Sequence, residues 1–204
     1  MIYSYEVNGL PVKTGDIVCT TNGKPNILPG EFWRLVGKLV PGDVDHVVIY
    51  LGPDGRFVEA GALGVVTFEI HNGAWLPEHT MAERGMLVDT FYGVSYPLDQ
   101  IGITHDQENE IRLGVAGFCL AHLGCPYNLN FLDPDRDDSF YCSQLAYKAY
   151  LPWGINLNSG MFMEQLPGTN QIIYPQEIWD GCSHRRDPEV EQAAAQASFS
   201  PQVG

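Results

Sequence analysis

A strand–turn–strand segment over residues 46–60 is the feature that most constrains the fold of this 204-residue chain. Residues 46–51, HVVIYL, are almost all β-formers, and the turn sequence GPDG follows at 52–55. Residues 56–60, RFVEA, then provide a return strand, and residues 64–70, GVVTFEI, predict a third strand. The pattern predicts an antiparallel sheet at the centre of the fold.

Two longer helices are predicted after these strands. The first runs from about residue 104 to residue 122, with Thr104 or Asp106 as its N-cap and Gly124 as its stop. The second, FYCSQLAYKAY at 140–150, follows an aspartate-rich loop. The 22 Gly and 14 Pro imply many turns, which favours a mixed α/β or β-rich chain over a helix bundle.

Two stretches are less regular. Residues 31–40, EFWRLVGKLV, have apolar residues at helical spacing and predict a short amphipathic helix. Residues 71–100 are irregular, and only a short strand near residues 86–88 is predicted there. A hydrophobic fraction of 45% is sufficient for a full core. We therefore expect one α+β domain over residues 1–187, followed by a flexible tail at 188–204.

The charge and the cysteine count restrict the partners and the compartment. A net charge of −14 repels phosphate backbones, so we expect no nucleic-acid partner. The first residues, MIYSYEVNGLPVKTGD, have neither a basic start nor an apolar run, and no stretch approaches the ~18 apolar residues of a membrane helix. Five cysteines, an odd number without framework spacing, fit a reducing cytoplasm. Secretion without a cleaved signal remains the alternative.

Cys142 is the candidate nucleophile among the five cysteines. A cysteine attacks only as a thiolate, and the partial positive charge of a helix N-terminus stabilises that anion. Only Cys142 lies at the predicted start of a helix that follows a loop. The remaining cysteines are expected to be small buried or surface side chains: Cys19, Cys119, Cys125 and Cys182.

His46 and Glu59 are the candidates for the base and for the group that holds the base. If residues 52–55 form a four-residue loop, Val48 lies opposite Glu59, and His46 is diagonal to Glu59 on the same face. Diagonal Cα atoms are ~7–8 Å apart, which these side chains can bridge. With a three-residue loop and a bulge, Glu59 would turn to the other face. A glutamate in the apolar segment FVEA also predicts a partner for its charge.

Together these motifs resemble the NlpC-type papain-like hydrolases. In the usual order of that family, a helix ends in G-x-P-Y, and the catalytic cysteine follows at the start of a helix. A P-G-D strand, a strand beginning with histidine and a polar third residue come afterwards. The corresponding segments of this chain are GCPY at 124–127, YCS at 141–143, GDIV at 15–18, HVVIY at 46–50 and Glu59.

The order of these segments is rotated, because the G-D strand and the histidine strand precede the cysteine. The chain therefore resembles the circularly permuted, YiiX-like branch of amidases and, more distantly, the lecithin retinol acyltransferase group. The segment YPQEI at 174–178 is similar to a Y-P-x-x-I segment of the YiiX-like proteins. The resemblance spans residues 13–180 and implies a papain-like fold, in which an antiparallel sheet or half-barrel packs against a few helices.

The resemblance implies a cysteine hydrolase that cleaves a peptide or acyl-amide bond through a thioester, without a cofactor. It implies Cys142 as nucleophile, His46 as base and Glu59 as the residue that orients the base. Cell-wall peptides, protein amides and acyl lipids are all compatible substrates. The expected substrate-binding residues are Tyr127, which matches a tyrosine at the active site of the family, Tyr50 on the histidine strand, and Trp33.

Three other interpretations stay open at this point. The first is an acyltransferase or lipid acyl hydrolase of the lecithin retinol acyltransferase type, although a histidine is typical there at the position of Glu59. The second is a non-catalytic module of the same fold that binds a peptide or a lipid. The third is a zinc site at Cys119, His122 and Cys125, which are spaced by three residues but interrupted by Gly124. Because no fourth ligand is evident, we expect no metal.

Overall fold

The structure is a computed structural model that describes residues 1–21, 42–85, 87–158, 160 and 172–192. The helix expected at 31–40, with Trp33 in it, and the end of the expected tail lie outside the described residues.

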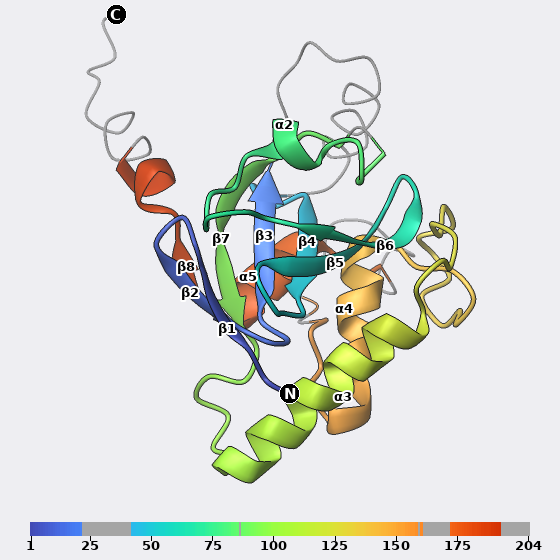
Figure 1. Cartoon of the computed structure of the whole chain (residues 1–204). Coiled ribbons are helices and arrows are strands. Elements are labelled where there is room, and N and C mark those ends of the chain that lie inside the picture. The colour runs from blue at the N-terminus through green and yellow to red at the C-terminus, as the bar shows by residue number, and fades with distance from the viewer. Residues whose placement is uncertain (22–41, 86, 159, 161–171, 193–204) are drawn as a thin grey trace, which may run out of the picture.

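A six-stranded antiparallel sheet forms the centre of the molecule (Figure 1). In spatial order its strands are β6 (Gly64–Glu69), β5 (Arg56–Gly61), β4 (His46–Tyr50), β3 (Ile17–Thr21), β7 (Thr90–Tyr96) and β8 (Ser183–Arg186). A separate hairpin consists of β1 (Ser4–Val7) and β2 (Leu10–Lys13). This mixed α+β arrangement of a sheet and a few helices confirms the predicted fold class.

The helices and the hairpin cover opposite faces of the sheet. The helical elements are α2 (Pro77–Thr80), α3 (His105–Ala121), α4 (Cys142–Tyr150), the 3-10 turn η1 (Leu151–Trp153) and α5 (Pro175–Gly181). One apolar core joins the sheet to α3, α4 and α5. A second core lies between the sheet, the β1–β2 hairpin and Trp75. Among the described residues, no helix has the length and apolar character needed to cross a membrane.

Local signals set the two longer helices. Thr104 caps α3, because its Oγ1 accepts the Gln107 N–H at 3.3 Å while the Gln107 Oε1 accepts the Thr104 N–H at 2.9 Å. Helix α4 begins at Cys142, two residues after its expected start, because Tyr141 is still extended (φ −94°, ψ 167°). The late start makes Cys142 the first residue of the helix.

The β4–β5 hairpin has the register that a four-residue loop requires. Ile49 pairs with Val58, and the Leu51 N–H donates to the Arg56 carbonyl oxygen at 2.9 Å. Gly55 in the loop has φ +80°, and a Cβ there would collide with the Ile70 carbonyl oxygen. Continued by one residue from Ile49 and Val58, the register places Val48 opposite Glu59.

The segment between β6 and β7 differs from its prediction. The strand expected near residues 86–88 is absent at the described positions 87 and 88. The chain instead forms the seven-residue strand β7, which pairs with β3 on one side and β8 on the other. Local pattern did not indicate this strand, because its polar and glycine positions are stabilised by two neighbouring strands rather than by alternation.

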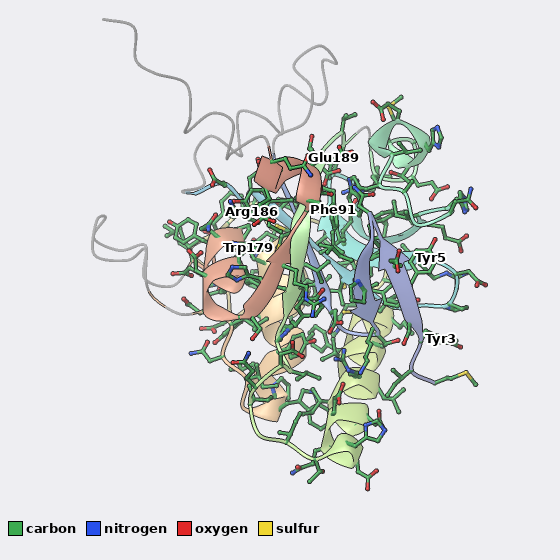
Figure 2. All side chains as sticks on the ribbon, turned by 90° about the vertical axis from the view of Figure 1, so that its left-hand side faces the viewer. Tyr3, Tyr5, Phe91, Trp179, Arg186 and Glu189 are labelled. Carbon is green, nitrogen blue, oxygen red and sulfur yellow. The ribbon has the colours of Figure 1, made fainter. Side chains whose placement is uncertain are left out.

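Strand β8 forms the edge of the sheet next to β7. Figure 2 shows the molecule from this edge, with Tyr3 and Tyr5 on one side of the view and Trp179 and Arg186 on the other. Trp179 of α5 stacks on His184 of β8, with ring centroids 4.1 Å apart. Residues 188–192 are helical, and the Glu191 N–H donates to the Asp187 carbonyl oxygen at 2.9 Å.

Candidate active site

Cys142 lies at the N-terminus of α4 and is 7% exposed. The first turn of the helix is held in place by two neighbouring side chains. The Ser143 hydroxyl donates to the Ile173 carbonyl oxygen at 2.7 Å. The Gln144 Oε1 accepts the Tyr141 N–H at 3.2 Å and the Asn128 amide N–H at 3.1 Å. The backbone around the thiol is therefore rigidly placed.

His46 opens β4 and contacts Glu59 of the neighbouring strand. The His46 Nε2 lies 2.8 Å from the Glu59 Oε2, and the imidazole is 12% exposed while the carboxylate is fully buried. Since a carboxylate only accepts, Nε2 carries the proton and donates it. This leaves Nδ1 free for a second partner.

His46 also interacts with Cys142. Burial alone would lower the pKa of His46. Cys142 and Glu59 both raise it, each by its charge and a side-chain hydrogen bond, and together they outweigh burial. The pKa of His46 is consequently well above its ordinary value. Residues from α4, β4 and β5 thus meet at one point, although they are up to 96 positions apart in the sequence.

A buried guanidinium lies behind Glu59. Arg84 is 0% exposed, and its Nε and Nη2 donate to the Glu59 carboxylate at 2.7–3.1 Å. Its Nη1 and Nη2 also donate to Asp89, at 2.7 and 2.9 Å. Burial would raise the pKa of Glu59, but the Arg84 charge and the hydrogen bond from His46 hold it below its usual value. The carboxylate is therefore ionised although it is fully buried.

Arg84 and Asp89 were not identified from the sequence. Both lie in the irregular stretch between β6 and β7, where no periodicity indicates which side chains point inward. The one available signal was the charge of Glu59 in an apolar strand, which predicted a partner but gave no means of choosing it.

The three expected substrate-binding residues have different positions. Tyr127 lies close to the site, since it forms a β-bridge with Phe140, two residues before Cys142. Burial, and after it the charges of Cys142, Tyr141 and Glu59, raises the pKa of its hydroxyl. Tyr50 is not brought to the site: it is fully buried in the core beneath the hairpin, 5.9 Å from the Tyr5 ring centroid. Trp33 lies outside the described residues.

Three of the other cysteines have environments that suppress ionisation. Burial raises the pKa of Cys19, Cys119 and Cys182 to about 12 each. Cys125 is half-buried just past the end of α3. The buried surroundings of Cys19, Cys119 and Cys182 are typical of inert thiols.

The described residues contain no group of three His, Cys, Asp or Glu side chains that could hold a metal ion. In the candidate triplet, Cys119 is buried in the core, and the His122 Nδ1 bonds to the Phe118 carbonyl oxygen at 2.8 Å. The described residues therefore give no support for a zinc site at Cys119, His122 and Cys125.

One comparison with known proteins gave a match. A sequence model of the permuted papain-like amidase enzymes of the YaeF/YiiX type, the C92 family, matches residues 12–180. Searches of the curated proteins and of the solved structures gave no match. The matched range contains the whole sheet except β8, together with α3, α4 and nearly all of α5.

Proposed function

Because the chain belongs to the permuted papain-like amidase family, we propose that it is a cysteine hydrolase that cleaves an amide bond through a thioester on Cys142. The observation that carries the proposal is the position of His46, whose ring contacts Glu59 through Nε2 and interacts with Cys142 at the start of α4. In this proposal Cys142 is the nucleophile, His46 the base and Glu59 the group that orients the base, the three roles that a cysteine hydrolase needs.

The first half of the reaction forms the thioester. His46 takes the Cys142 thiol proton at Nδ1, and Glu59 stabilises the resulting imidazolium through Nε2. The thiolate attacks the carbonyl carbon of the amide, and the C–N bond then breaks. The imidazolium returns its proton to the departing amine, so His46 is neutral again when the thioester has formed.

The second half releases the acid product. His46 takes a proton from water, whose oxygen attacks the thioester carbon. The C–S bond breaks, and the proton returns to sulfur, which restores the Cys142 thiol. An alcohol or amine acceptor in place of water would give acyl transfer by the same steps. A carboxylate at Glu59, where the acyltransferase group typically has histidine, supports hydrolysis.

Backbone and side-chain donors near Cys142 support the charged intermediate. The tetrahedral intermediate carries a negative charge on the former carbonyl oxygen, and the Cys142 N–H at the helix N-terminus is placed to donate to it. Tyr127, whose hydroxyl stays protonated at neutral pH, is the second proposed donor. Together they would replace the hydrogen bonds that the oxygen loses when water is displaced.

The test uses a thiol-reactive acyl probe and the variant Cys142→Ala. We expect the wild-type protein to be labelled and the variant to show no labelling, while its circular dichroism spectrum is unchanged. Cys125→Ala is the matched control, because the Cys125 thiol is partly exposed and can meet the probe without help from His46 or Glu59. Labelling that persists in Cys142→Ala and disappears in Cys125→Ala would overturn the proposal.

A further inference from the structure

The segment between β6 and β7 supplies a buried ion pair to the back of the site. In Figure 1 this segment, which includes α2, crosses the sheet at the end where β3 finishes and β4 begins. Arg84 is fully buried there, with its guanidinium carbon 4.4 Å from the Phe68 ring centroid and 5.2 Å from that of Trp75. Two aromatic faces and two carboxylates therefore fix the guanidinium in one orientation.

Asp89 is the second carboxylate bonded to Arg84, after Glu59, and it is 2% exposed. Besides its two bonds from Arg84, its Oδ2 accepts the Thr20 hydroxyl at 2.6 Å. Thr20 pairs directly with His46 across β3 and β4. The chain of contacts from Glu59 through Arg84 and Asp89 therefore ends on the strand next to the histidine.

The net charge of these buried side chains determines how well they stabilise an imidazolium at His46. Glu59 and Arg84 alone would cancel, which would leave no net negative charge for an imidazolium at His46. With Asp89 ionised, the three side chains carry one net negative charge. In a buried site this difference matters, because the low local dielectric strengthens every charge interaction.

Other titratable groups also face His46. Cys142 approaches from α4 and Glu59 from β5, and both favour the imidazolium. Asp45 precedes His46 and is partly buried, while Tyr127 lies near both Cys142 and Glu59. Asp89 accepts its hydrogen bonds from Arg84 and Thr20, so it can be varied without changing the side-chain bond of the ring to Glu59.

We propose that Arg84 and Asp89 are positioning residues for the reaction: Arg84 holds Glu59 ionised and aimed at His46, and Asp89 restores the negative charge that Arg84 would cancel. The inference rests on the proposed function, because it assigns these residues a role through Glu59 and His46. The irregular segment between β6 and β7 then contributes to catalysis through these two positioning residues.

The first test is the titration of His46 by NMR in a Cys142→Ala background, in which the thiolate no longer contributes. We expect Asp89→Asn to lower the His46 midpoint by about one pH unit, because the isosteric amide removes a charge and keeps the shape. Asp16→Asn is the matched control: Asp16 is also 2% exposed and is bonded to a buried arginine, Arg112, at 2.7 Å. An unchanged midpoint in Asp89→Asn would overturn the inference.

The second test measures the rate at which iodoacetamide alkylates Cys142. Peptide mass assigns the modification to this residue. Free thiols ionise near pH 8.5, so only an imidazolium partner gives fast alkylation at pH 6. We expect Asp89→Asn to reduce the rate about tenfold at pH 6 and to leave it unchanged at pH 9.5. A merely structural role of Asp89 would change both rates alike, and that result would refute the inference.

The double variant Arg84→Met, Asp89→Asn keeps the inference testable if the single variant does not fold. Replacing a buried ion pair as a whole is tolerated better than breaking it. Without Arg84 the buried Glu59 takes up a proton more readily, so we expect the acid limb of the alkylation profile to move up by about one pH unit. An alkylation profile identical to that of the wild type would contradict the role of Arg84.

The two proposals fail in different ways. If wild-type Cys142 reacts at pH 6 no faster than free cysteine, the proposed function fails, and the inference fails with it. If wild-type Cys142 is fast at pH 6 and the variants are equally fast, only the roles of Arg84 and Asp89 are lost.

Discussion

At the scale of single residues, the site is defined by the way burial and charge oppose each other. Glu59 is ionised because Arg84 and His46 outweigh the effect of burial, and its contribution to stability is present above the ordinary glutamate range and lost as the pH falls through its lowered pKa. His46 has the opposite sign: its raised pKa gives stability that is complete below the ordinary histidine range and is lost as the pH rises through the raised value.

Asp45 differs from both, because no cation is strong enough to offset its burial. Burial raises its pKa to about 7, against a smaller lowering by His46. The folded protein thus binds a proton that the unfolded chain releases near pH 4, so Asp45 destabilises the fold increasingly between about pH 4 and pH 7. We expect Asp45→Asn to increase the free energy of unfolding by about 2 kcal/mol at pH 8 and by less at pH 5.

Urea denaturation at the two pH values measures this difference. Asp43→Asn is a suitable control, because Asp43 is exposed and near in sequence. An Asp45→Asn effect that does not depend on pH would show that Asp45 has an ordinary pKa.

At the scale of elements, the start of α4 depends on the buried side chain of Gln144. Besides its two accepted bonds, its Nε2 donates to the Pro134 carbonyl oxygen at 2.9 Å and to the Arg136 carbonyl oxygen at 3.3 Å. One amide therefore joins the aspartate-rich loop to the first turn of the helix. The position of Cys142 is set by this connection as well as by the helix.

Removal of that amide should destabilise the protein and reduce the reaction rate of the Cys142 thiol. We expect Gln144→Ala to reduce the free energy of unfolding by about 2–3 kcal/mol, because several buried polar groups lose their partner. Gln107→Ala is the matched control: Gln107 has the same capping position in α3 but is exposed, so about 0.5–1 kcal/mol is expected. Equal losses in the two variants, measured by urea denaturation, would contradict the role of the buried amide.

At the scale of the whole molecule, a strongly negative surface surrounds an interior in which several carboxylates are paired with arginine. The net charge is −14, while the buried carboxylates of Glu59, Asp89 and Asp16 are each paired with arginine. Screening by salt acts on exposed charges and much less on buried pairs. Self-repulsion of the surface is therefore the electrostatic contribution that solution conditions can change.

An increase of NaCl from about 20 to 300 mM should raise the midpoint of thermal unfolding by a few degrees, since the Debye length shortens to below ~8 Å. Differential scanning calorimetry at constant pH checks this expectation. A midpoint that falls with salt would show that surface ion pairs, such as Arg56–Glu69, outweigh the repulsion.

The sequence by itself determined the parts of this protein that depend on local chemistry. The GPDG turn and its flanking β-formers predicted the hairpin and narrowed its register to two choices, one of which puts His46 and Glu59 on one face. Thr104 was one of two candidate caps for α3. The motifs around Cys142, His46 and Glu59 indicated the family, because their order along the chain is itself a property of the sequence.

Only the tertiary structure decided which distant side chains complete the site. Arg84 and Asp89 reach Glu59 from a stretch without periodicity, and Tyr50 enters the core although its motif suggested the site. β7 is a strand because β3 and β8 flank it. In each case the deciding free energy comes from burial and pairing with residues far away in sequence, which no local pattern encodes.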